Sequence, residues 1–213
     1  MDIAKFKQLP VMGVLRGVKP DVLLPLLDVA ANAGLETVEI TMNTKDASSL
    51  IRQAVKSYAG RLCVGAGTVL DLKGLKEALE AGATFIVTPV LVEDVAQYCA
   101  KNKIPVFPGA LTPLEVYRAW QAGATMVKVF PAKVFGPEYF KELKGPFQDI
   151  ELLACGGVTP ESMQAYFDNG ASAITFGASV FRKDLIDKKD YATISLNIGR
   201  YLSGFKRRAN NGS

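Results

Sequence analysis

The stretch QAGATMVKVFP, residues 121–131, decides the fold because three other segments of the chain resemble it. They are NAGLETVEI (32–40), EAGATFIVTP (80–89) and DNGASAITFG (168–177). In each, a helix-like stretch ends at a glycine, the residue preferred just after a helix, and a short β-rich run follows. The four glycines stand between 41 and 48 residues apart. This period is too long for one strand–helix unit and suits two.

The second strand of each repeat is predicted from four apolar runs broken by Gly or Pro, at 9–17, 62–69, 104–109 and 150–157. Strands with few polar residues, alternating with amphipathic helices such as that over 92–102, indicate a buried parallel sheet. Eight strand–helix units favour a (β/α)₈ TIM barrel, an α/β fold. We expect one domain over residues 1–213 with a frayed C-terminal tail from about residue 206. An open doubly wound sheet would carry a Gly-rich fingerprint after its first strand, and GVLRGVKP (13–20) does not match it.

The composition argues against several classes of protein, namely nucleic-acid-binding, membrane-spanning and secreted proteins. The net charge of +4 is spread without a basic stripe or a nucleic-acid-reading motif, which argues against a nucleic-acid partner. Neither a membrane-spanning run nor a signal peptide is predicted. Three cysteines without CxxC spacing indicate free thiols and a cytoplasmic protein. Because the chain has no histidine, the commonest zinc ligand is missing and acid–base chemistry must come from other side chains.

Three ionisable side chains are predicted to converge inside the barrel. The active site of this fold lies at the C-terminal ends of the strands, where alternate side chains point inward. In MVKVF (126–130) the valines suit the helix-facing layer, which sends Lys128 inward. The same parity sends Glu39 inward from VEIT (38–41), and Arg16 inward near the end of its strand. Each residue alone fits a structural ion pair equally well, but together they favour a functional site.

Glycines mark the edges of this predicted site. Gly65 and Gly67 are expected to leave the barrel mouth roomy beside the Thr68 hydroxyl, although a tight turn or close packing is the alternative. ACGGVTPE (154–161), with a helix starting near Thr159, and FGAS (176–179) follow the seventh and eighth strands. Loops there, with a helix N-terminus, usually cradle phosphate in this fold.

These residue types suit carbon–carbon cleavage next to a keto acid. A desolvated lysine near other positive charge keeps a fraction of neutral amine, which attacks a carbonyl to give a Schiff base. The protonated imine stabilises a carbanion, and Glu39 is the available proton shuttle. Two alternatives remain open: a phosphosugar isomerase or epimerase with Glu39 as base, and a non-catalytic barrel that binds a phosphorylated ligand.

The sequence resembles the class I aldolases acting on 2-keto-3-deoxy-6-phosphogluconate and 4-hydroxy-2-oxoglutarate, from about Pro10 to about Phe181. The motifs that carry the resemblance are VEITMNT (38–44), VGAGTVL (64–70), FIVTPV (85–90), FPGALTP (107–113), VKVFPA (127–132), CGGVTPE (155–161) and FGAS (176–179). Their number and order make the resemblance specific to this family.

The resemblance implies a role for each matched residue. It makes Lys128 the Schiff-base residue and Glu39 the acid/base of a lyase that forms pyruvate and glyceraldehyde 3-phosphate. The remaining implied residues are Arg16, Thr68, Pro89 and Asn43 around the substrate, and the backbone of Gly156, Gly157, Gly177 and Ser179 around its phosphate. The implied substrate is a phosphorylated keto-deoxy sugar acid. No metal or other cofactor is implied, and members of the family are typically homotrimers.

Two positions depart from the family pattern. Some members carry Arg where this chain has Asn43, and Thr where it has Cys155. Asn43 cannot bind a carboxylate through two charged hydrogen bonds as arginine does. We therefore expect Arg16 to bind the carboxylate. An asparagine at this place also resembles the relatives that cleave the 6-phosphogalactonate epimer. That epimer and 4-hydroxy-2-oxoglutarate therefore stay open as alternative substrates.

Overall fold

The computed structural model describes the backbone of residues 1–211 and the side chains of residues 1–205. The strands are β1 (Val11–Leu15), β2 (Thr37–Thr41), β3 (Cys63–Gly67), β4 (Ile86–Val87), β5 (Val106–Phe107), β6 (Gly109–Ala110), β7 (Val127–Val129), β8 (Leu152–Ala154) and β9 (Ala173–Phe176). The helices are α1 (Ile3–Gln8), α2 (Pro20–Asn32), α3 (Ala47–Ser57), α4 (Leu72–Glu80), α5 (Glu93–Lys101), α6 (Pro113–Gln121), the 3₁₀ turn η1 (Ala132–Val134), α7 (Glu138–Lys144), α8 (Met163–Asp168), α9 (Lys183–Asp187) and α10 (Tyr191–Asn211).

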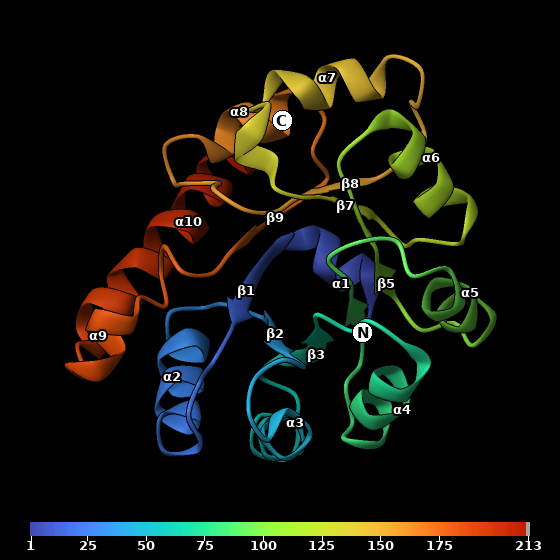
Figure 1. The fold of residues 1–213 in the computed structure, drawn as a ribbon. Coiled ribbons are helices and arrows are strands. Elements are labelled where there is room, and N and C mark those ends of the chain that lie inside the picture. The colour runs from blue at the N-terminus through green and yellow to red at the C-terminus, as the bar shows by residue number, and fades with distance from the viewer. Residues whose placement is uncertain (212–213) are drawn as a thin grey trace.

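The sheet closes on itself. Its order is β5-β4-β3-β2-β1-β9-β8-β7-β6, and all paired strands run parallel. The two ends of this order, β5 and β6, are consecutive pieces of one segment, interrupted at Pro108, which has no N–H to donate. That segment bonds β4 on one side and β7 on the other, so eight strand segments form the barrel, with helices around it (Figure 1). The predicted (β/α)₈ fold is confirmed.

Each of the four repeated segments in the sequence corresponds to the end of a helix in the structure. Gly34, Gly82, Gly123 and Gly170 all have φ between +92° and +99°, the left-handed conformation that glycine adopts without strain. At the first of them, the N–H of Leu35 donates to the carbonyl of Ala30 at 3.0 Å, which satisfies a carbonyl left free by the end of α2. A strand follows each glycine: β2, β4, β7 or β9.

Side chains on the strands divide into two buried layers, as the predicted alternation requires. Val127 and Val129 belong to the large apolar cluster between strands and helices. Met126, Phe107 and Phe6 belong to a separate, smaller cluster that includes inward-facing residues of the strands. Phe6 comes from α1, which lies across the barrel in Figure 1, and its ring centroid is 6.0 Å from that of Phe107. This packing fills the N-terminal end of the barrel, which leaves the C-terminal ends of the strands for the site.

The C-terminal helix α10 covers the seam between the first and last parts of the chain. It packs against α2 and α8 and buries Ile194, Ile198, Tyr201 and Leu202. The backbone of residues 206–211 belongs to α10, and residues 212 and 213 of the expected frayed tail lie outside the described residues. Within the described chain, no helix combines the length and apolar character needed to cross a membrane.

Candidate active site

A cavity of about 610 Å³ lies at the C-terminal ends of the strands. The structure brings nearly every residue singled out in the sequence to its wall: Arg16, Glu39, Thr68, Pro89, Lys128, Gly156, Gly157, Gly177 and Ser179. Asn43 does not line the cavity, but its side-chain oxygen accepts a hydrogen bond from Arg16 at 3.3 Å. The residues therefore form one cluster, although they come from seven different strands or the loops after them.

Lys128 extends from β7 into this cavity and is only 6% exposed. Its Nζ lies 5.1 Å from the centroid of the Phe130 ring. Its charge interacts with the buried carboxyl of Glu39, yet the two side chains do not form an ion pair. The amine is thus held in mostly apolar surroundings without being tied to a carboxylate, which leaves it available for chemistry.

Glu39 is buried more deeply, with 2% of its surface exposed. Burial raises the pKa of its carboxyl, while the positive charges of Lys128 and Arg16 act to lower it. Its Oε2 is buried and has no hydrogen-bond partner among the described residues. A buried carboxyl oxygen without a partner costs stability, so its presence in a cavity indicates a functional role.

The glycines of β3 do not leave the barrel mouth roomy, and that expectation is wrong. A Cβ on Gly65 would lie 2.4 Å from the ring of Phe85, and one on Gly67 would lie 2.6 Å from Oε1 of Glu39. Side chains from the neighbouring strands therefore occupy the space that each glycine leaves. Gly67 serves to admit the carboxyl of Glu39 rather than to widen the entrance.

Arg16 follows β1 at the rim of the cavity and is exposed. Besides its bond to Asn43, its guanidinium donates to Oγ1 of Thr68 at 3.4 Å. Two neutral oxygens thus orient the guanidinium without neutralising its charge. A cation held in this way suits the binding of a carboxylate.

Two glycine loops, residues 155–159 after β8 and residues 177–179 after β9, also line the cavity wall. Gly156 and Gly157 have φ of +88° and +90°. The backbone N–H groups of Gly156, Gly157, Gly177 and Ser179 find no acceptor in the described part of the chain. Several unpaired N–H groups on adjoining loops are the usual means of binding an oxyanion through the backbone.

Helix α8 begins at Met163, later than the start near Thr159 that the sequence suggested. The reason is local. Thr159 N–H donates to Oγ of Ser162 at 2.9 Å, and Ser162 N–H donates to Oγ1 of Thr159 at 3.2 Å. These side-chain bonds, together with backbone bonds from Ser162 and Met163 to the carbonyl of Thr159, form a turn ahead of the helix.

Sequence reasoning missed several residues of the cavity wall, among them Phe130 and Thr175. Thr175 is 3% exposed and lies two residues after the inward-facing Ala173, so strict alternation along β9 predicts it. The Cys155 thiol interacts with both Thr175 and Lys128, and burial raises its pKa. The described residues contain no group of three or more metal-ligating side chains that could hold an ion.

A family model described as KDPG and KHG aldolase matches residues 3–196. The chain belongs to the KDPG and KHG aldolase family. Aldolases are carbon–carbon lyases, and the resemblance predicted from the motifs is confirmed. Two curated relatives and one solved structure show the same family.

The 2-dehydro-3-deoxy-6-phosphogalactonate aldolase of Escherichia coli (strain K12) is 35% identical over 176 residues, which is 82% of this chain and 86% of that protein. The 2-dehydro-3-deoxy-phosphogluconate aldolase of Pseudomonas aeruginosa is 32% identical over 173 residues, 81% of this chain and 78% of that protein. A solved structure described as native KDPGal superposes with a TM-score of 0.88 and 30% identity, covering 95% of this chain and 97% of that one. Relatives named for both sugar-acid epimers are thus similarly close to this aldolase.

Proposed function

We propose that this aldolase cleaves 2-keto-3-deoxy-6-phosphogluconate to pyruvate and glyceraldehyde 3-phosphate through an imine on Lys128. The observation that carries the proposal is the Lys128 amine, 6% exposed and without an ion pair to any described residue, in one cavity with the buried carboxyl of Glu39. A site for imine chemistry needs such an amine and a proton shuttle beside it.

The proposed reaction begins when the amine of Lys128 adds to C2 of the substrate and water leaves, which gives a protonated imine. Glu39 removes the proton of the C4 hydroxyl, and the C3–C4 bond breaks. The aldehyde departs while the electron pair of that bond passes into the imine to form an enamine. Glu39 returns its proton to C3, and water hydrolyses the imine to pyruvate and the free amine. The raised pKa of Glu39 suits a group that must both take and return a proton.

The two ends of the substrate match the two polar regions of the wall. We assign the carboxylate to Arg16, with Thr68 and Asn43 orienting the guanidinium and Pro89 lining the pocket. We assign the phosphate to the two glycine loops, whose backbone N–H groups find no acceptor within the described residues.

Borohydride trapping tests the chemistry. Incubating the protein with pyruvate and borohydride should add the mass of the reduced adduct at Lys128, and Lys128→Met should abolish both the adduct and the cleavage. Lys101→Met, on the exposed end of α5, is the matched control and should keep both. Turnover that survives trapping with substrate would instead favour an isomerase or epimerase. Function that survives in Lys128→Met would favour a non-catalytic binding barrel.

The choice of substrate needs its own measurement. The 6-phosphogalactonate epimer and 4-hydroxy-2-oxoglutarate are the alternatives, because the relatives include enzymes named for the galactonate acid. Pyruvate release from all three acids, compared as kcat/KM, ranks them. A preference for the galactonate epimer would overturn the gluconate assignment and leave the imine chemistry intact.

We also propose that the protein is a homotrimer of the cytoplasm. Large apolar side chains stand exposed near the barrel mouth, namely Val90, Phe130, Val134 and Phe135. A groove of about 290 Å³ runs between Val90, Leu111 and Phe130. Apolar surface gathered in this way is typical of an interface, and a head-to-tail contact between three copies closes into a ring. The three free cysteines fit a reducing compartment.

A further inference from the structure

We propose that Tyr201 of α10 is a positioning residue for the phosphate of the substrate, because it ties the two glycine loops to each other. This inference rests on the proposed function, since it assumes that the phosphate binds between these loops. Tyr201 is 1% exposed and does not line the cavity. It would act only through the loops that do.

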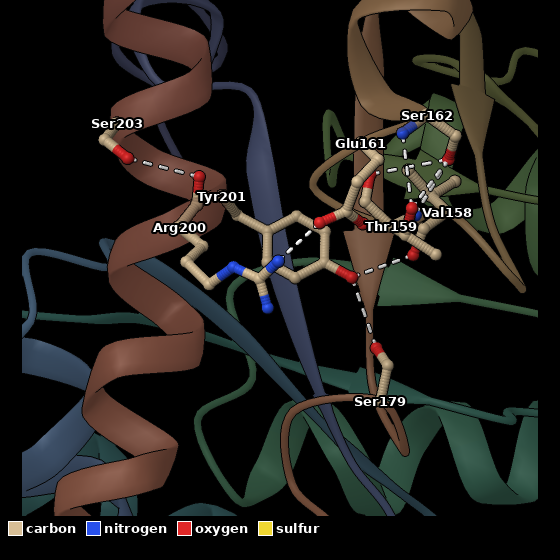
Figure 2. A network of polar contacts seen from close by, with 8 residues as sticks. All are labelled: Val158, Thr159, Glu161, Ser162, Ser179, Arg200, Tyr201 and Ser203. Carbon is tan, nitrogen blue, oxygen red and sulfur yellow. Dashed lines mark hydrogen bonds and ion pairs between the residues drawn. The ribbon is translucent and has the colours of Figure 1, made fainter.

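The hydroxyl of Tyr201 touches both loops at once. It donates a hydrogen bond to the carbonyl of Val158 at 2.8 Å and lies 3.3 Å from Oγ of Ser179. Figure 2 shows the side chain reaching from α10 to a point between these two residues. Its ring is held in position by Phe176, the last residue of β9, with the ring centroids 4.7 Å apart. One side chain therefore sets the spacing between a loop after β8 and a loop after β9.

The protons of this network can be assigned. A phenol has one proton, and a carbonyl can only accept, so the proton of Tyr201 goes to Val158. Ser179 must then donate its own hydroxyl proton to the Tyr201 oxygen. Burial raises the pKa of Tyr201, which keeps the phenol protonated at ordinary pH.

This assignment has a consequence for anion binding. With the hydroxyl proton of Ser179 directed at Tyr201, the donor that Ser179 offers to a phosphate is its backbone N–H. The carbonyl of Val158 also has its partial negative charge engaged by a donor. Both effects leave the loops presenting N–H groups, which favours an anion.

A second link joins α10 to the loop after β8. The guanidinium of Arg200 pairs with the carboxylate of Glu161, as Figure 2 also shows. These side chains are 54% and 65% exposed, and ion pairs at such exposure contribute little. The buried hydroxyl of Tyr201 is therefore the link expected to matter.

Tyr201→Phe tests the inference because it removes one oxygen and keeps the ring on Phe176. We expect the Kd for inorganic phosphate, measured by calorimetry, and the KM for the phosphorylated acid to rise together by roughly 5- to 30-fold, because the variant loses both the bond to Val158 and the bond from Ser179. The borohydride-trapped pyruvate at Lys128 should not change. Tyr191→Phe, on the same helix, is the matched control, because that hydroxyl has no hydrogen-bond partner among the described residues. It should leave every value as in the wild type.

Ser179→Ala serves as a second variant should Tyr201→Phe fold poorly. It removes only the bond that Tyr201 accepts, so the Kd for phosphate should rise by less than in Tyr201→Phe. An unchanged phosphate Kd in both variants would overturn the inference. So would a loss of pyruvate trapping as large as the loss of phosphate binding, because Tyr201 would then only hold the barrel together.

The same measurements distinguish an error in the proposed imine chemistry from an error in the role of Tyr201. Wild-type protein that binds phosphate but traps no pyruvate at Lys128 would refute the imine and leave the role of Tyr201 to be decided by the phosphate Kd. Wild-type protein that traps pyruvate but binds no phosphate would overturn the inference and leave the imine standing.

Discussion

The buried carboxyl of Glu39 and the buried amine of Lys128 are residues that stability alone would not select. Each is removed from water, and they do not neutralise each other as an ion pair. A buried group without a partner costs free energy of folding. The site therefore lowers the stability of the fold in order to hold reactive groups. This loss of stability can be measured at Glu39.

Glu39→Gln should lower kcat by about 10²- to 10⁴-fold, the usual effect of losing a general acid/base. The same change should raise Tm at neutral pH. Because burial raises the pKa of Glu39 in the folded state, the folded protein holds this proton more tightly than the unfolded chain. Wild-type stability therefore falls as pH rises from the ordinary pKa of a carboxyl through the raised folded value, and the glutamine variant escapes that fall.

Thermal unfolding and kcat/KM over a range of pH check this prediction. The acid limb of kcat/KM should lie above the ordinary carboxyl range in the wild type. Glu36→Gln is the control, since this residue just before β2 is partly exposed and pairs with Lys5 at the surface. A glutamine variant at residue 39 that is less stable than wild type at pH 8 would show that the buried charge carries no cost.

At the scale of elements, the pairing of β2 with β3 creates the space for the site. Residue 39 lies opposite Gly65, and Thr41 lies opposite Gly67. The carboxyl of Glu39 then extends toward the C-terminal end of the barrel and over Gly67, where any Cβ would meet it. A glycine on one strand is thus required by a carboxyl on the next.

Gly67→Ala should therefore lower kcat/KM at least about tenfold, because the carboxyl must move for the methyl group to fit, and a displacement of this size is costly to catalysis. Crowding at a closely packed position should also cost about 1–3 kcal/mol of unfolding free energy. Urea unfolding and steady-state kinetics measure the two effects.

Gly74→Ala is the matched control in α4. Its Cβ would lie 3.4 Å from Oδ1 of Asp71, an ordinary contact, and alanine favours a helix over glycine by about 0.5–1 kcal/mol. The two substitutions are chemically identical. If both gave the same stability and activity, the close approach at Gly67 would have no consequence.

At the scale of the whole molecule, several large apolar side chains near the barrel mouth are exposed to solvent in the single chain. Phe135 is 57% exposed and follows η1, close in sequence to the equally exposed Val134. The proposed trimer would bury these side chains. Their burial in the assembly would explain why the single chain carries them on its surface.

Phe135→Asp should convert the proposed trimer into single chains, because a charge would be buried without a partner at the interface. Light scattering coupled to size exclusion measures the mass. Leu196→Asp is the control, since this leucine is 67% exposed on α10 and outside the surface near the mouth. A Phe135 variant with the mass of the wild type would place the interface elsewhere.

The sequence by itself determined the barrel, the inward direction of Lys128 and Glu39, and the family. The family follows from the number and order of the matched motifs. The barrel and the inward side chains follow from local rules: the glycines at 34, 82, 123 and 170 mark helix ends, and alternation along a strand decides which way a side chain points. Both rules act over a few neighbouring residues, so they can be read along the chain.

Only the tertiary structure decided what fills the space around those residues. Phe85 and the carboxyl of Glu39 occupy the gaps left by Gly65 and Gly67. Tyr201 bonds to Ser179 and Val158, which lie 22 and 43 positions earlier in the chain. Among the described residues, Oε2 of Glu39 finds no hydrogen-bond partner and the glycine loops keep unpaired N–H groups. Whether a polar atom is satisfied depends on every group that the fold brings near it. Those groups come from distant parts of the chain, so no local pattern in the sequence contains the answer.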